Sequence, residues 1–384
     1  MACGIARLGA QESAPRGVRV SVGSGVETAD AAAGRAGASL ASTRIAAEAS
    51  QQRRSPRGSL RAWSGVTADQ WWQTGVRRSI AAAANVDGGV TLTRRMRLDF
   101  AERVSSAPLD LFAPRGAGVI AGAPPTVLSG SEIPATRTLS HNGLISLART
   151  IGPRSQVVVS GTQAIAMTGR DRVATSGATG RFERQVGRFT RWHAGYGFVL
   201  SSEQRVEHAA ERRQNADVAF DYTRPLPFWG HTTLAASAGG SLLTEAAGRR
   251  VRMNAGASLD HRLNGRWSVN VDYARPVEYL AGVVQPLVTD SVRVGAAGLL
   301  PRQISFAIAA GASSGSVGVV GGSRFASYVG TAHASRRLGP DWQLDIEVHD
   351  SWYRFDASPG AGIPAAFARR GFRAGLVWIP RMRG

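Results

Sequence analysis

A strict alternation of apolar and polar residues, repeated along most of the chain, is the feature that most constrains its fold. In residues 265–274, Trp267, Val269 and Val271 share one face of an extended chain, and polar residues take the other. Residues 341–349, DWQLDIEVH, follow the same rule. Side chains of a strand point alternately to opposite faces, so a period of two predicts strands with one apolar and one polar face. We find no helical pattern of comparable strength, and the sequence therefore predicts an all-β protein.

Short turn signals recur along the chain at a nearly constant spacing. Those from Gly152 to Gly339 lie 35 to 42 residues apart, a length that holds two strands, one tight turn and one longer loop. Asn264-Gly265 is a strong hairpin signal because both residues tolerate positive φ. Eight such turns predict 16 strands, and one strand at each end of the series, about 17–28 and 369–380, raises the count to 18. The turn markers are Ser55-Pro56, Gly88-Gly89, Gly152, Gly187, Trp229, Asn264, Pro301 and Gly339.

The connections between these hairpins are longer and more polar, and an even strand count places both termini with the short turns. Examples are residues 203–214, 278–290 and 356–368. The longest runs from Leu109 to Pro134, and structureless loops of that length are uncommon unless they have a function. Its apolar content favours a loop that packs into the interior or over its mouth, and a mobile surface loop is the alternative.

Both a soluble sandwich and a membrane barrel show alternation, but three features favour the barrel. The strands have about 10 to 14 residues, whereas soluble strands usually have about 5 or 6 and a tilted membrane-spanning strand needs about 9–11. The polar faces carry ionised residues in mid-strand, as the inner wall of a water-filled barrel does. Tryptophan concentrates at strand ends, as expected of two interfacial girdles. We predict that the interfacial aromatic residues are Trp71, Trp72, Trp192, Trp229, Trp267, Trp342, Trp352 and Trp378.

The last alternating segment, RRGFRAGLVWIP (Arg369 to Pro380), carries Phe372, Leu376 and Trp378 on one face. With its short turns, long loops and girdles, the chain resembles the porin-like outer-membrane β-barrels of Gram-negative bacteria. The resemblance implies one transmembrane antiparallel up-and-down β-barrel over residues 15–384, with about 18 strands and 16 as the next count. It also implies an outer-membrane location, contact with lipids including lipopolysaccharide, and recognition of the closing strand by the barrel-assembly machinery. Six residues follow Trp378, whereas the family pattern usually stops at such an aromatic.

Residues 1–14, MACGIARLGAQESA, lack the apolar core of a secretory signal. We interpret them as the remnant of a signal peptide whose start was lost. A chain that is not exported is the alternative, and the single cysteine, Cys3, is then an ordinary free thiol. One cysteine excludes a disulfide framework and any clustered cysteine metal site.

The formal net charge is +19, with 46 basic and 27 acidic residues, and all the basic residues are arginine. Such a charge is a signature of nucleic-acid binding. Here the alternation along each strand places many charged residues on the polar strand faces. There they either attract anions or pair with one another. Loop residues Arg205, Arg212 and Arg213 alternate with Glu207 and Glu211, which indicates a solvated, partly self-neutralised loop. On the outer surface, these arginines also suit lipopolysaccharide phosphates. The predicted pore-lining residues are Arg191, His193, Arg252, Asp260, Asp272, Asp345, Glu347, His349 and Arg373.

Two motifs suggest chemistry and both have a plainer interpretation. Residues 311–315, GASSG, match the G-x-S-x-G pattern of a nucleophile elbow, but no helix pattern follows and a strand end fits better. Asp345, Glu347 and His349 lie on one strand face, and same-face neighbours about 6–7 Å apart suit a charged wall better than a tight cation shell. We therefore expect no catalytic residues, metal or cofactor, and no enzyme.

The function expected from these features is a porin-like channel for small solutes, with anionic solutes a candidate class. The first alternative is a plugged barrel that serves as a structural anchor or as a component of a surface or export system. The second is a soluble basic β protein that binds nucleic acid, which would need aromatic residues interleaved with the basic ones. Here the aromatics lie on the faces opposite the charges, so we expect no nucleic-acid partner.

Overall fold

A computed structural model describes residues 17–31, 38–71, 77–110, 132–168, 171–203, 211–222, 232–245, 248–279, 286–317, 323–356 and 365–380. They form 19 strands and one short 3-10 helix, η1 (Pro301–Gln303). The strands are β1 (Gly17–Ala31), β2 (Ala38–Ser55), β3 (Gly58–Trp71), β4 (Arg77–Thr93), β5 (Met96–Asp110), β6 (Glu132–Gly152), β7 (Ser155–Thr168), β8 (Asp171–Gln185), β9 (Thr190–Glu203), β10 (Glu211–Tyr222), β11 (Thr232–Glu245), β12 (Gly248–Asn264), β13 (Trp267–Arg275), β14 (Val277–Tyr279), β15 (Pro286–Leu300), β16 (Ile304–Val317), β17 (Arg324–Arg337), β18 (Trp342–Phe355) and β19 (Ala366–Trp378).

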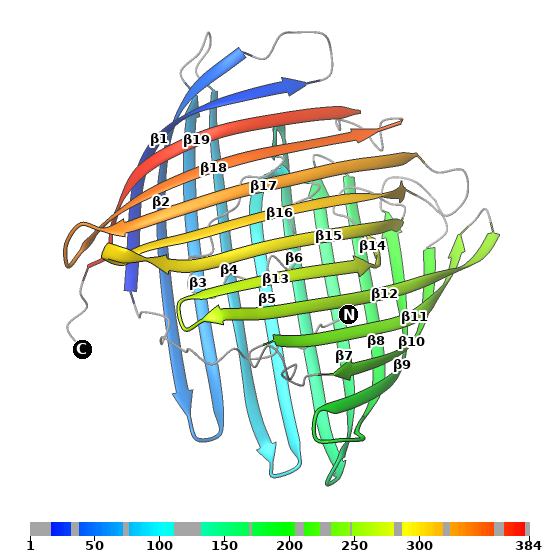
Figure 1. Cartoon of the computed structure of the whole chain (residues 1–384). Coiled ribbons are helices and arrows are strands. Elements are labelled where there is room, and N and C mark those ends of the chain that lie inside the picture. The colour runs from blue at the N-terminus through cyan, green and yellow to red at the C-terminus, as the bar shows by residue number, and fades with distance from the viewer. Residues whose placement is uncertain are drawn as a thin grey trace.

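The strands form one antiparallel up-and-down sheet that closes on itself (Figure 1). Each strand pairs with its neighbours in the chain, and β1 also pairs with β19, from Val20 opposite Trp378 to Ala31 opposite Phe367. β13 and β14 both pair with β15, so they occupy one position, interrupted at Pro276. The ring therefore has 18 strand positions. The predicted all-β barrel of about 18 strands is confirmed.

Most of the short turns lie where the sequence predicts them, with one exception. Gly88 and Gly89 lie inside β4, and the turn between β4 and β5 is formed by Arg94 and Arg95. The prediction of a turn at Gly88-Gly89 was wrong because these glycines serve close packing. A Cβ on Gly89 would overlap the carboxylate of Asp99 on the neighbouring strand. The turn at residue 229 lies outside the described residues.

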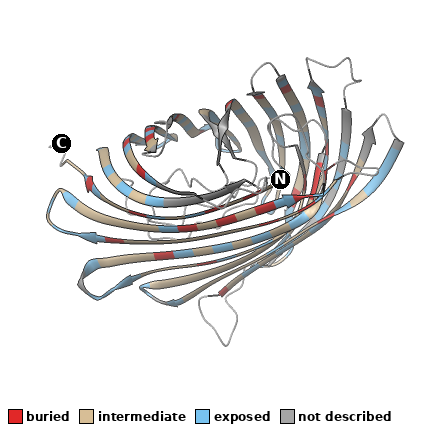
Figure 2. Ribbon diagram, turned by 90° about the horizontal axis from the view of Figure 1, so that it is seen from above, coloured by how far each residue is buried: buried red, intermediate tan, exposed pale blue. Residues whose placement is uncertain are grey.

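The two faces of the sheet differ in kind, and the strands curve around a central interior (Figure 2). Directly opposed residues of an antiparallel pair lie on the same face, so the register carries the assignment around the ring. One face, the outer face, carries exposed large apolar side chains on almost every strand, among them Val22, Val26, Ile45, Val66, Ile80, Ile145, Val159, Phe198, Val218, Val251, Met253, Val294, Ile308, Val348, Phe372 and Leu376. A monomeric soluble protein rarely exposes a contiguous apolar band of this extent.

Several predicted features fall on residues that the structure does not describe. Residues 1–14, the predicted signal remnant, and most of the predicted 109–134 loop lie outside the described residues. Parts of the other long loops do as well. In the described part of the chain, no helix has both the length and the apolar character needed to cross a membrane.

Candidate functional site: the charged inner face

The face opposite the exposed apolar side chains, called the inner face below, carries the charged residues. All nine predicted pore-lining residues lie on it, in β9, β12, β13, β18 and β19. The register links them to inner-face partners, for example Glu347 opposite both Arg373 and His333. Their role in lining a pore remains a prediction, whereas their common face is a property of the fold.

One group of inner-face charges spans β17, β18 and β19. The Arg373 guanidinium lies 3.6 Å from the Glu347 carboxylate, and both side chains are largely buried. His333 approaches Asp345 at 3.9 Å, and the Gln343 amide donates a hydrogen bond of 2.6 Å to the same carboxylate. Much of the predicted charge here is therefore paired, which is the alternative that the sequence left open.

A second pair lies across the closure from this group, on β2 and β3. Arg44 donates two hydrogen bonds to Asp69, at 2.6 and 2.9 Å, and the Asp69 side chain is only 5% exposed. Such a two-pronged contact holds a carboxylate in a fixed orientation. The sequence interpretation missed this pair. The alternation around these residues is imperfect, because Thr43 precedes Arg44 and Gln70 follows Asp69, and the register that joins the two strands is not a local signal.

A third group lies on β7, β8 and β9 near the short turns. Glu183 is buried and is held by Arg181 at 2.5 Å and by Arg191 at 3.3 Å. Gln156 donates a further hydrogen bond of 2.5 Å to this carboxylate. Two guanidinium groups and one amide therefore hold the Glu183 carboxylate. The predicted site residue His193 lies directly opposite Glu183 in the register.

A fourth group lies on β12, β13 and β15, where the predicted residues Asp260 and Asp272 occur. Asn270 donates a hydrogen bond of 2.9 Å to Asp272, and Arg293 lies opposite Asp272 in the register. Arg252 lies toward the other end of β12, beside the buried Ser241. Arg252 lies three strand positions away from the predicted basic residues Arg191 and His193 of β9.

Two inner-face arginines differ from these paired ones. Arg61 in β3 and Arg103 in β5 are exposed, and within the described residues neither forms an ion pair. Asp87 lies directly opposite Arg61 in the register but forms no ion pair with it, so both guanidinium groups are accessible to solutes. Among the inner-face residues whose side chains the structure describes, arginines outnumber carboxylates: Arg19, Arg44, Arg54, Arg61, Arg97, Arg103, Arg181, Arg191, Arg250, Arg252, Arg262, Arg293, Arg337, Arg369 and Arg373 against Glu48, Asp69, Asp87, Asp99, Glu183, Asp260, Asp272, Asp345 and Glu347.

The inner face also carries an aromatic cluster at the long-loop ends of β17, β18 and β19. Tyr353 stacks on Phe367 with ring centroids 5.8 Å apart and meets the edge of Phe355 at 5.6 Å. Phe325 lies 5.7 Å from Phe355. All four side chains are buried, and Tyr353 is fully so. A packed apolar cluster therefore lines part of the interior at this end.

The described tryptophans that were predicted at the membrane interface lie on the outer face near strand ends. Trp192 packs near Phe182, and Trp342 and Trp378 are exposed and directly opposed. The other two pack near outer-face aromatics, Trp267 beside Phe306 and Trp352 beside Tyr328. Trp72 and Trp229, and the side chain of Trp71, lie outside the described residues. Their interfacial role stays a prediction.

An ion pair lies among the apolar side chains of the outer face on β5 and β6. His141 in β6 lies 3.2 Å from Glu102 in β5, and Glu102 is 61% exposed. The pair is flanked along β5 and β6 by exposed Val104, Leu139 and Ile145. A charged side chain facing lipid is unfavourable, with acidic residues less so than basic ones.

Replacing both members of this pair, as Glu102→Leu with His141→Leu, is expected to stabilise the folded barrel in lipid by about 1 kcal/mol. The measurement is the temperature at which the folded form is lost on a gel after heating in vesicles. The double change Val104→Ala with Leu139→Ala serves as the control and is expected to destabilise the barrel. A lower unfolding temperature for the leucine variant would contradict the prediction.

Neither of the two motifs with possible chemistry forms a reactive site in the described residues. Residues 311–315 lie inside β16, with Ser313 opposite Ser291 and Ser327, and no helix follows them there. Across the described chain, no three histidine, cysteine, aspartate or glutamate side chains come together in a metal-binding arrangement. Asp345, Glu347 and His349 do share one face of β18, as predicted.

No protein-family model and no curated protein matches the sequence. Among solved structures, the chain is similar to OccK2 of Pseudomonas aeruginosa in complex with glucuronate, with a TM-score of 0.46 and 11% identity over 95% of this chain and 98% of that one. It is similar to OccK7 of the same organism, with a TM-score of 0.45, 11% identity and coverage of 95% and 98%. For the FrpB iron transporter of Neisseria meningitidis, the TM-score is 0.47 at 9% identity, with coverage of 91% and 63%.

Proposed function

We propose that the chain forms a porin-like channel in the outer membrane of a Gram-negative bacterium and passes small, preferentially anionic solutes. The observation that carries the proposal is the closed ring of 18 strand positions with an exposed apolar outer face and a charged inner face. Apolar residues toward lipid and polar ones toward the interior are the reverse of a soluble barrel. Rings of this size, near the 16 to 18 strands of known porins, leave room for an aqueous channel.

The preference for anions rests on the arginine surplus of the inner face. Paired groups such as Arg44 with Asp69 contribute little net field, because their charges cancel. The exposed Arg61 and Arg103 form no ion pair within the described residues. A cleft lined by one sign of charge concentrates counter-ions and repels co-ions.

The test is reconstitution of the purified, folded protein into planar bilayers with a potassium chloride gradient. We expect stepwise conductance. We also expect a reversal potential shifted from zero toward the equilibrium potential of chloride. Absence of conductance from protein that migrates as a folded barrel on a gel would contradict the channel. Conductance with a reversal potential shifted toward the equilibrium potential of potassium would support the channel but contradict its anion preference.

A second candidate function is a plugged barrel that anchors a surface or export component. The observation that favours it is the buried aromatic cluster around Tyr353, together with the buried inner-face residues His349 and Arg369. Interior side chains of an open, water-filled barrel are expected to be wetter than this. Copurification of a stable partner with a non-conducting barrel would favour this function over the channel.

Contact with lipopolysaccharide is proposed for the long-loop end. There, Arg370 is 73% exposed on the outer face and donates a hydrogen bond of 3.1 Å to Asp350, beside Tyr328 and Trp352. Exposed guanidinium groups suit phosphate. We also propose that the assembly machinery recognises β19, which ends at Trp378 and closes the ring against β1.

A further inference from the structure

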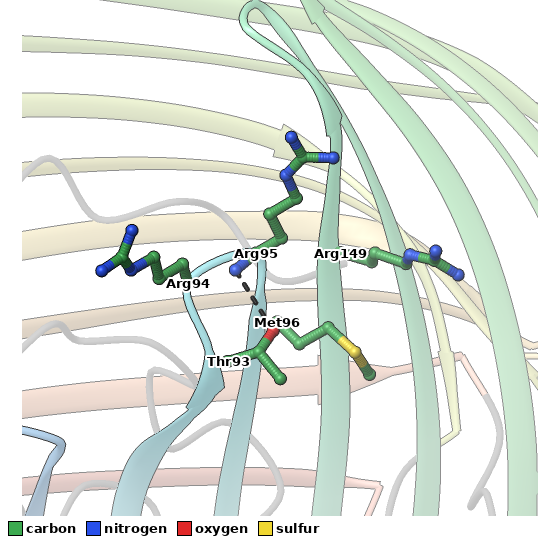
Figure 3. A pocket seen from close by; sticks show the side chains of 5 residues that line it. All are labelled: Thr93, Arg94, Arg95, Met96 and Arg149. Atoms are coloured by element: carbon green, nitrogen blue, oxygen red, sulfur yellow. Dashed lines mark hydrogen bonds between the residues drawn. The ribbon is translucent and has the colours of Figure 1, made fainter.

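The turn between β4 and β5 carries a shallow basic depression of about 420 Å³ on the short-turn end of the barrel. It is lined by Thr93, Arg94, Arg95, Met96 and Arg149. Arg94 and Arg95 come from the turn itself, and Arg149 comes from the neighbouring strand β6. Figure 3 shows the three guanidinium groups spread around the turn, with the Arg95 amide held by a 3.2 Å hydrogen bond to the Thr93 hydroxyl.

These three arginines carry free charge. All three side chains are exposed, and no carboxylate pairs with any of them in the part of the chain that the structure describes. The nearby Asp99 is taken by Arg97, which donates to it at 2.8 and 3.0 Å on the inner face. The depression therefore concentrates positive charge without a protein partner to neutralise it.

The depression lies at the edge of the apolar outer face. Met96 and Arg149 are opposed in the register, and the next outer-face rows along the same strands pair Leu98 with Leu147 and Phe100 with Ile145. Leu92 near the end of β4 and Ile151 near the end of β6 are exposed as well. The guanidinium groups thus lie just beyond the apolar rows that would face acyl chains. This position corresponds to the level of the lipid headgroups.

We propose that this depression, called the turn site below, binds the phosphate of an anionic phospholipid in the leaflet at the short-turn end. Guanidinium groups present several fixed donors that match phosphate oxygens. The adjacent apolar rows favour a lipid over a soluble anion, because a lipid places its acyl chains against Leu98 and Leu147 while its phosphate lies in the depression that Arg94, Arg95 and Arg149 line.

Other short turns repeat the same combination and support the proposal. Exposed arginines without a described ion pair occur beside the exposed residues Ile151, Val186 and Leu338 of the outer face. They are Arg154 in the β6–β7 turn, Arg184 and Arg188 around the β8–β9 turn, and Arg336 and Arg337 before β18. The turn site differs from these in bringing three such residues around one depression.

The proposal rests on the proposed membrane location but not on conduction, so its test measures lipid binding rather than current. The folded protein is exchanged into detergent with added phosphatidylglycerol or phosphatidylcholine, and retained lipid is counted by native mass spectrometry. We expect preferential retention of phosphatidylglycerol. The triple variant Arg94→Gln, Arg95→Gln, Arg149→Gln is expected to lose at least tenfold in affinity, because each basic residue near an anionic surface contributes about 1 kcal/mol and 1.4 kcal/mol is tenfold.

The matched control is the triple variant Arg172→Gln, Arg249→Gln, Arg324→Gln, which removes the same charge from exposed positions at the long-loop ends of β8, β12 and β17. It is expected to retain phosphatidylglycerol as the unchanged protein does. Equal losses in both variants would overturn the proposal in favour of a net-charge effect. Displacement of the lipid by inorganic phosphate at equal concentration would overturn it in favour of a soluble-anion site. A barrel that conducts ions but shows no lipid preference would contradict the turn site and would still support the proposed channel.

Discussion

Replacing Gly25 with valine is expected to abolish the closed form of the barrel. Gly25 lies on the inner face of β1 opposite Arg373 of β19, where the ring closes. A Cβ there would overlap the Phe372 carbonyl oxygen and lie 3.0 Å from the Arg373 Cα. The obstacle is backbone rather than a movable side chain, so the two strands must separate to admit valine. Overpacking typically costs about 1–3 kcal/mol, and here it also breaks the ladder that joins the first strand to the last.

The measurement is migration on an SDS gel before and after heating, where a closed barrel runs differently from the unfolded chain. We expect the folded band to be absent for Gly25→Val. Gly180→Val is the control, because Gly180 lies on the outer face of β8 with no atom within 4 Å of an added Cβ. A β-branched residue suits an exposed strand position, so this control is expected to fold. A Gly25→Val protein with a normal folded band would show that β1 and β19 do not pair as described.

The fold was predictable from the sequence because its two main signals are local. Alternation assigns each residue to a face, and the turn spacing sets the number of strands. The error at Gly88-Gly89 shows the limit of this approach. A glycine pair signals a turn when only neighbours in the sequence are considered, but here the glycines make room for Asp99 and Phe100 on the next strand. That requirement is tertiary, and no local pattern contains it.

The candidate site was predictable only in part for a related reason. The alternation along the strands placed all nine predicted residues on one face, which is the inner face. It did not indicate which of them form ion pairs. Arg373 is largely buried against Glu347, and Arg191 shares Glu183 with Arg181. These partnerships depend on the register between strands and on side-chain reach. The exposed Arg61 and Arg103 were not singled out for the same reason, since the alternation gives their face but does not show whether they form an ion pair.

Ion selectivity is expected to depend on the inner-face arginines that form no ion pair rather than on the paired ones. The double variant Arg61→Glu with Arg103→Glu is expected to lower the chloride-to-potassium permeability ratio about tenfold. Both side chains are exposed on the inner face, so reversing them replaces free positive charge with free negative charge in the water-filled interior. Fields of several kT along a charged cleft change local ion concentrations by factors of this size. Paired residues such as Arg44 should contribute much less, because their field is already cancelled by Asp69.

The measurement is the reversal potential of single channels in a potassium chloride gradient. The matched control, Arg172→Glu with Arg324→Glu, reverses two exposed arginines on the outer face, and we expect it to leave the permeability ratio near that of the unchanged protein. Equal shifts for the two double variants would mean that net charge, rather than the inner face, sets selectivity. An unchanged ratio for the inner-face variant would mean that permeating ions do not pass Arg61 and Arg103.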